Sequence, residues 1–205
     1  MGGTTYPRMG KRTAGAAWAL GAYVGAILTT LPVLPLLWVP IRDRFGSTAE
    51  RSLTALLVLL GLTIGLGLIR RPLSSRASLL LLGVAIVYGW FLWALENPVE
   101  KVHLAEYGFL SHLSLRYLGA RGARSTGLGL GRPHGREDRW GLRARALALV
   151  FSVGLLDEFI QYFLPNRYGD LRDVGLNWLA GLLALVVSEV WDGPHPGERI
   201  REEMP

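Results

Sequence analysis

The chain of 205 residues contains no cysteine. This absence excludes a disulfide framework and thiolate chemistry, and it leaves the redox compartment undetermined. Any metal ion would need histidine, carboxylate or backbone oxygen ligands. Acidic residues are also scarce, with 16 Asp and Glu against 22 Lys and Arg. Because the arginines lie in short connections beside apolar segments, we attribute the positive charge to membrane topology and expect no nucleic-acid partner.

Long uncharged runs, by contrast, are abundant, and hydrophobic residues make up 50% of the chain. Three runs contain no charged residue and come close to or exceed the ~20 residues that cross a bilayer. Three further segments are apolar but carry polar residues at their ends or along one face. We therefore predict an all-α, polytopic transmembrane helix bundle of about six transmembrane helices, at about 14–39, 52–69, 77–95, 99–118, 142–164 and 174–191.

The remaining segments predict how the chain is organised around this membrane domain, which spans 14–191. We predict that residues 1–13 form a flexible basic leader and that residues 119–141 form a flexible Arg/Gly-rich loop. Residues 192–205 are predicted to form a polar tail. With six crossings, sixteen of the 22 basic residues fall on the side of the amino terminus, which predicts that both termini are cytoplasmic. The first apolar run is longer than the apolar region of a typical cleaved signal peptide. We therefore predict that it is retained as a membrane anchor.

Two prolines and several glycines bear on how these helices end and pack. Pro32 and Pro35 should kink or end the first helix near its far side. Pairs of glycines four residues apart, at 21 and 25 and at 61 and 65, favour close packing within the chain over a dedicated dimer motif. The oligomeric state therefore stays open.

A first polar cluster begins the fourth predicted helix. Glu106 lies about 60 degrees round the helix from His103, and Lys101 points elsewhere, toward head groups or a carboxylate. Charged side chains at membrane depth normally face protein or water, so this cluster should face the bundle interior. Helical steps of three and four residues place a single stripe of side chains on that face, namely Glu100, His103, Tyr107, Ser111 and Ser114.

A second polar cluster joins the fifth and sixth predicted helices. Asp157, Glu158 and Gln161 spread over about 100 degrees of arc and can face one cavity. Asp173 is predicted to cap the sixth helix, and Asn177 follows one turn later on the same face. A small-residue face then continues along this helix for close packing, through Ala180, Gly181, Ala184 and Ser188. By the predicted topology, both clusters lie on the outer side of the membrane.

The two clusters also contain ordered motifs. The first is Pro98-Val99-Glu100-Lys101-Val102-His103-Leu104-Ala105-Glu106-Tyr107, and the second comprises Glu158-x-x-Gln161, Pro165-x-Arg167 and Asp173-x-x-x-Asn177-x-x-x-Gly181. Together they resemble the signature of VanZ-like membrane proteins, over about residues 55–190. The family more often has Asp where this chain has Glu100. The namesake of the family is associated with low-level resistance to teicoplanin-type glycopeptide antibiotics, so the resemblance implies a cell-envelope setting.

Three hypotheses of function follow. In the first, the chain binds or handles a lipid-linked envelope component, or a lipid-like or glycopeptide-type amphiphile, among the membrane lipids of the cytoplasmic membrane. Arg167 would meet its phosphate or carboxylate, and an outer-face pocket would bind it. The residues predicted to bind this substrate are Glu100, Lys101, Tyr107, Asp157, Gln161, Arg167, Asp173 and Asn177.

The second hypothesis is an intramembrane hydrolase or transferase acting on such a lipid. Glu158 would be the general base, His103 an acid or second base, and Arg167 the electrophilic clamp. The catalytic candidates are thus Glu158, His103 and Glu106, and these same three residues are candidate ligands of a divalent metal ion. In the third hypothesis the polar residues only neutralise one another and brace the bundle.

Overall fold

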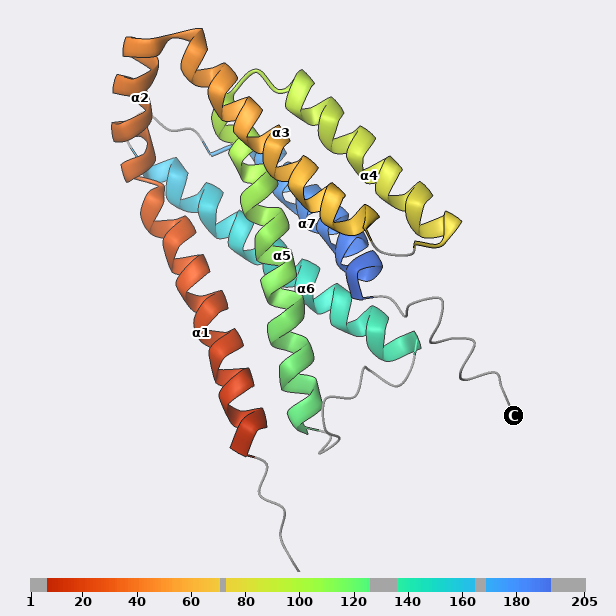
Figure 1. The fold of residues 1–205 in the computed structure, drawn as a ribbon. Coiled ribbons are helices and arrows are strands. Elements are labelled where there is room, and N and C mark those ends of the chain that lie inside the picture. Colours follow the sequence, from red (N-terminus) through yellow and green to blue (C-terminus); the bar gives the residue numbers. More distant parts are fainter. Residues whose placement is uncertain (1–6, 71–72, 126–135, 165–168, 193–205) are drawn as a thin grey trace, which may run out of the picture.

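The computed structural model describes residues 7–70, 73–125, 136–164 and 169–192, and within these ranges the only regular elements are helices (Figure 1). The prediction of an all-α membrane bundle is confirmed, because five helices are long and apolar enough to cross a membrane. The helices are α1 (Pro7–Thr30), α2 (Val33–Phe45), α3 (Ser47–Ile69), α4 (Ser75–Ala94), α5 (Pro98–Ser125), α6 (Arg136–Phe163) and α7 (Leu171–Asp192).

Helix α5 occupies the middle of the bundle (Figure 1). It packs chiefly against α7, α1 and α6, and less extensively against α3 and α4. Its inward side chains include Leu104, Tyr107 and Leu110, each at most 1% exposed. Because neighbouring helices shield it from lipid, α5 tolerates polar residues that a lipid-facing helix could not carry. This position explains why α5 is not among the five apolar helices that could span a membrane.

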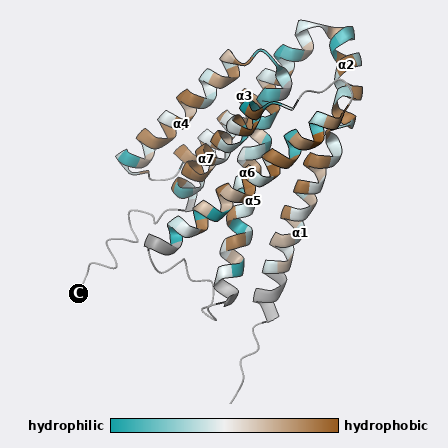
Figure 2. Ribbon diagram, turned by 180° about the vertical axis from the view of Figure 1, so that it is seen from behind, coloured by the Kyte–Doolittle hydropathy of each residue, from teal (hydrophilic) through white to brown (hydrophobic). Residues whose placement is uncertain are grey.

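The outer helices show the opposite pattern. Large hydrophobic side chains are exposed along α3 and α4, including Leu56, Leu59, Ile86 and Trp93. Figure 2 shows hydrophobic residues running along both helices. Such exposure would be costly in water, whereas lipid chains solvate it, so these surfaces fit a bilayer environment.

The first predicted span is two helices in the structure. The chain turns at Leu31 and Pro32, and α2 then begins at Val33 and continues to Phe45. Proline lacks a backbone N–H and cannot continue the preceding hydrogen-bond ladder, which is the reason for the break. Gly46 connects α2 to α3 with a positive φ of 54°, a conformation that glycine adopts without a steric penalty.

The termini and the Arg/Gly-rich loop differ in part from the prediction. Helix α1 already begins at Pro7, inside the predicted leader. Residues 119–125 and 136–141 are helical, so α5 and α6 continue into the segment predicted as a loop. Most of the predicted tail, and loop residues 126–135, lie outside the described residues. The count of six crossings and the cytoplasmic placement of both termini stay predictions.

The small-residue face of α7 packs as its sequence indicates. Ala180 is fully buried, and a Cβ atom on Gly181 would lie 3.0 Å from Cγ1 of Val150 in α6. The glycine pairs in α1 and α3 behave differently. No atom lies within 4 Å of a Cβ built on Gly21, Gly25, Gly61 or Gly65. The prediction that these four pack closely within the chain is therefore wrong for the described residues, because α1 and α3 turn other faces toward the bundle.

We expect Gly181→Ala to destabilise the protein relative to Gly175→Ala. Both changes replace a glycine in α7 and gain up to ~1 kcal/mol of helix propensity. Only the change at 181 forces a methyl group against Val150, at a cost of about 1–3 kcal/mol, whereas no atom lies within 4 Å of the Cβ position at 175. Unfolding in detergent measures both variants, and equal stabilities would contradict the close approach of α6 and α7.

Candidate functional site

Buried polar side chains line the interior of the bundle around α5. The buried ionisable side chains, His103, Asp157 and Glu158, lie near the start of α5 and the end of α6. The ionisable groups of the interior are therefore gathered at one end of the bundle. The complete set of buried polar side chains among the described residues is His103, Ser111, Ser114, Asp157, Glu158, Gln161, Asn177 and Ser188. We call His103, Tyr107, Asp157, Glu158 and Gln161 the polar cluster.

Asp157 is fully enclosed within the polar cluster, with 0% of its surface exposed. The hydroxyl of Tyr107 donates to its Oδ2 at 2.6 Å, and Nε2 of Gln161 donates to its Oδ1 at 2.9 Å. Hydrogen bonds to a charged acceptor are about twice as strong as neutral ones. The bond from Tyr107 joins α5 to α6, the bond from Gln161 lies within α6, and together they fix the orientation of the carboxylate.

Glu158 lies beside Asp157 and is 4% exposed. Its Oε1 accepts a bond of 3.3 Å from Nε2 of Gln161, and its Oε2 accepts one of 2.8 Å from the backbone N–H of Asp170. The second bond requires the chain to return close to α6. Gly169 permits this return, because a Cβ atom there would lie only 2.6 Å from the carbonyl oxygen of Glu158.

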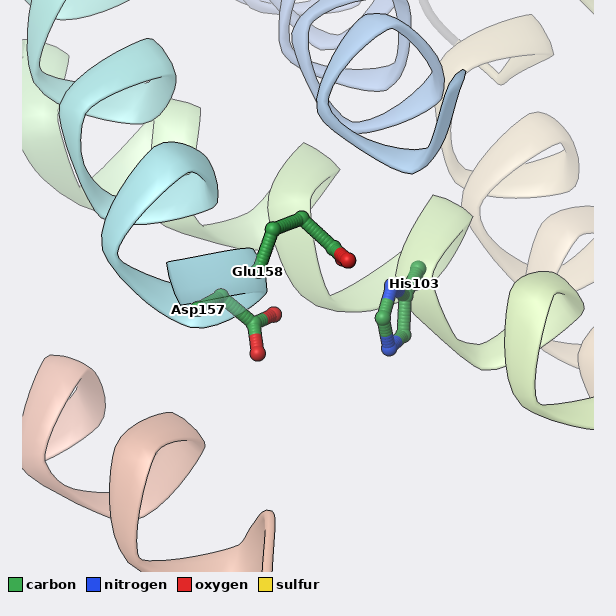
Figure 3. Close-up of side chains that lie close together, drawn as sticks. All are labelled: His103, Asp157 and Glu158. Carbon is green, nitrogen blue, oxygen red and sulfur yellow. The ribbon is translucent and has the colours of Figure 1, made fainter. Parts of the chain in front are cut away.

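His103 completes a group of three possible metal ligands. One ligand atom from each of His103, Asp157 and Glu158 lies within 4.8 Å of the others, and all three side chains are buried. Figure 3 shows the Glu158 carboxylate extending toward the His103 ring, with Asp157 beside it. One imidazole nitrogen and two carboxylates suit divalent cations such as zinc or manganese. The sequence indicated Glu106 where the structure has Asp157.

The other predicted residues of the first cluster surround this group without joining it. Glu106 is half-buried, and the Tyr23 hydroxyl of α1 donates to its backbone carbonyl at 3.2 Å. Lys101 donates to the Thr54 hydroxyl of α3 at 3.2 Å and forms no ion pair with a carboxylate of the described residues, while its contact with lipid head groups stays a prediction. Glu100 is half-buried at the start of α5.

At the start of α7 the structure corrects one assignment. Asp170, not Asp173, provides the cap, because its Oδ1 accepts from the N–H of Arg172 at 2.8 Å. Asp173 lies inside the first turn, where its negative charge favours the positive end of the helix dipole. The helix begins at Leu171, three residues earlier than a cap at Asp173 would require.

Asn177 lies one turn further along α7 and is 0% exposed. Its Nδ2 is 3.5 Å from the Cβ position of Gly154, which is also 3.5 Å from the ring of Tyr107. Neither polar atom of the amide has a hydrogen-bond partner among the described residues. The Ser111 hydroxyl, also fully buried, is likewise unsatisfied there. Buried polar groups normally have hydrogen-bond partners. The Asn177 amide and the Ser111 hydroxyl could therefore bind a polar ligand or water in the interior next to the polar cluster.

Sequence reasoning missed the contribution of Gly169 and Asp170 to the polar cluster. The available signal was the Gly-Asp pair that follows the end of a helix. Arg167, which was predicted to clamp an anionic group, lies outside the described residues, as does Pro165. Its role stays a prediction.

The charge of the polar cluster limits what it can bind. Asp157 and Glu158 form no ion pair with any lysine or arginine in the described part of the chain. A buried carboxylate is costly unless it meets a cation or several hydrogen-bond donors. The cluster therefore suits hydroxyl groups, amines or a metal ion, and a phosphate would reach it only through a cation.

Comparison with known proteins gives one match. The model of the VanZ/LLP1 family matches residues 54–192, which include every residue of the polar cluster. No curated protein and no solved structure matches the chain.

Proposed function

The chain belongs to the VanZ/LLP1 family, and from that premise we propose that it binds or handles a lipid-linked cell-envelope component in the cytoplasmic membrane. A lipid-like amphiphile of the glycopeptide type belongs to the same ligand class. The polar cluster, on the outer side of the membrane, would bind the polar head, while the apolar faces of the bundle accommodate the chains.

One observation carries the proposal: two buried carboxylates lie at one end of a bundle whose outer surface is apolar. Neither has a cationic partner among the described residues. Head groups with several N–H or O–H donors, such as sugars and primary amines, satisfy carboxylate acceptors directly. A choline head group is cationic but has no N–H or O–H donor on its ammonium group, so it would leave the carboxylates without a new hydrogen bond.

Native mass spectrometry of the full chain released from mixed bilayers tests this proposal. The bilayers contain phosphatidylcholine, phosphatidylethanolamine and a polyprenyl phosphate sugar in equal amounts. We expect preferential retention of the ethanolamine and sugar lipids over the choline lipid. Equal retention of all three would count against a head-group site in the polar cluster.

A second candidate function is an intramembrane hydrolase or transferase acting on the same class of lipid. The convergence of His103, Asp157 and Glu158 within 4.8 Å favours it. Glu158 would act as general base and His103 as acid or second base. A divalent cation bound by the three residues would supply Lewis-acid chemistry and would allow a phosphate to approach the carboxylates.

For the metal-assisted form of this candidate, we expect the purified protein to bind about one divalent ion per chain, with His103→Asn lowering the content at least about tenfold. His112→Asn is the matched control, since His112 lies on the same helix but its Nδ1 is 3.2 Å from the Ser188 hydroxyl, away from the polar cluster. Elemental analysis after dialysis against zinc or manganese measures the content. Equal metal content in both variants, or none in the parent protein, rejects this form.

A further inference from the structure

A second site lies at the opposite end of the bundle from the polar cluster. A cavity of about 460 Å³ is lined by Arg76, Arg139, Trp140, Arg143 and Glu189. These residues come from the start of α4, the start of α6 and the end of α7. Fifteen positions of α6 separate Arg143 from Glu158, a rise of about 22 Å. The two sites therefore lie well apart, toward different membrane faces. We call this cavity the basic pocket.

The lining of the basic pocket is mostly cationic, with three arginines and one glutamate. Glu189 pairs with only one of them, because its Oε1 lies 3.0 Å from an Nη atom of Arg143. The same guanidinium lies over the ring of Trp140, 5.2 Å from its centroid. Arg76 and Arg139 form no ion pair with any acidic residue in the described part of the chain. Among the described lining residues, arginines thus outnumber acidic residues by two.

We infer that the basic pocket binds an anionic phosphate, with the head group of an anionic phospholipid as its source. Guanidinium groups bind phosphate oxygens through paired hydrogen bonds. Basic pockets between membrane helices on the cytoplasmic side match the chemistry of such head groups. Trp140 is 60% exposed, and exposed tryptophan rings favour the membrane interface. Acyl chains can then follow the exposed apolar surface of α4. This inference is independent of the function proposed for the polar cluster.

The experiment measures retention of phosphatidylglycerol by the full chain in phosphatidylcholine nanodiscs, using native mass spectrometry. A double variant, Arg76→Gln with Arg139→Gln, removes both unpaired arginines of the pocket. We expect retention to fall by about a hundredfold, since each charge-assisted contact accounts for about tenfold. The matched control is Arg121→Gln with Arg145→Gln, which removes the same charge from exposed positions on α5 and α6. Only a few-fold loss is expected there.

A third variant, Glu189→Gln, is expected to change retention in the opposite direction. It releases Arg143 from its carboxylate partner, so retention of phosphatidylglycerol should rise several-fold. Misfolding could not produce such a gain, and unfolding in pure phosphatidylcholine confirms that all variants fold. Equal losses in the two double variants, or no gain from Glu189→Gln, would overturn the inference. A second arm adds inorganic phosphate, and binding of phosphate alone without retention of the lipid assigns the anion site to a soluble phosphate compound.

Discussion

Glu158→Gln is expected to lower the retention of sugar and ethanolamine head groups by at least about tenfold without lowering the stability of the protein. The glutamine keeps the shape of the side chain, and its amide oxygen can still accept from the backbone N–H of Asp170, which now lies 2.8 Å from Oε2. The negative charge and one acceptor oxygen are lost, and the new amide NH2 replaces the acceptor of the long 3.3 Å bond from Nε2 of Gln161, which keeps its bond to Asp157 at 2.9 Å. Removing a buried, unpaired charge is often neutral or stabilising, so the unfolding midpoint should stay the same or rise.

The matched control for this change is Glu96→Gln. Glu96 is exposed between α4 and α5, on the same side of the protein as the polar cluster, and makes no contact with it. Retention should be unchanged in the control. If Glu158→Gln instead lowers the stability of the protein and leaves the head-group preference intact, the polar cluster braces the bundle, and the binding proposal is wrong.

Tyr107→Phe is expected to have the largest effect on stability, a loss of about 3 kcal/mol. The change removes only a hydroxyl, so it creates no cavity of the kind that a large-to-small substitution leaves. That hydroxyl donates to Asp157 at 2.6 Å, in a site where both side chains are 0% exposed. Without it, a fully buried carboxylate oxygen loses its hydrogen-bond donor.

Two comparisons isolate this hydrogen bond. Tyr88→Phe also removes a buried hydroxyl, but one that donates to backbone carbonyls at 3.3 and 3.5 Å, so a smaller loss of about 1 kcal/mol is expected. In an Asp157→Leu background, Tyr107→Phe should cost almost nothing, because the acceptor is already absent. Chemical unfolding in detergent measures all four proteins. An equal cost of Tyr107→Phe in both backgrounds would show that Asp157 is not its energetic partner.

Sequence periodicity predicted which side chains of α5 face the interior, because the face of a helix on which a residue lies depends only on its position along that helix. Steps of three and four residues placed His103, Tyr107 and Ser111 on one face of α5, and the structure buries all three. Membrane topology predicted that this face meets the end of α6, since both carry polar residues on one side of the membrane. The family motifs of the two clusters likewise fall within the residues that the VanZ/LLP1 model matches.

What sequence could not predict depends on how helices rotate and pack against one another. The sequence indicated Glu106 as a candidate metal ligand, whereas in the structure it is Asp157 whose carboxylate lies within 4.8 Å of possible ligand atoms of His103 and Glu158. The cap at Asp170 and the close approach of Gly169 arise from the path of the chain between α6 and α7. No periodic pattern specifies that path.

An experimental density map of the full chain in a lipid bilayer tests the central claim most directly. We predict density for an amphiphile at the start of α5, the end of α6 and the start of α7, with its polar head within hydrogen-bond distance of Glu158 and a cation beside His103 if the head carries phosphate. A map with ordered lipids on the outer faces of α3 and α4, but only protein side chains in the polar cluster, would contradict it.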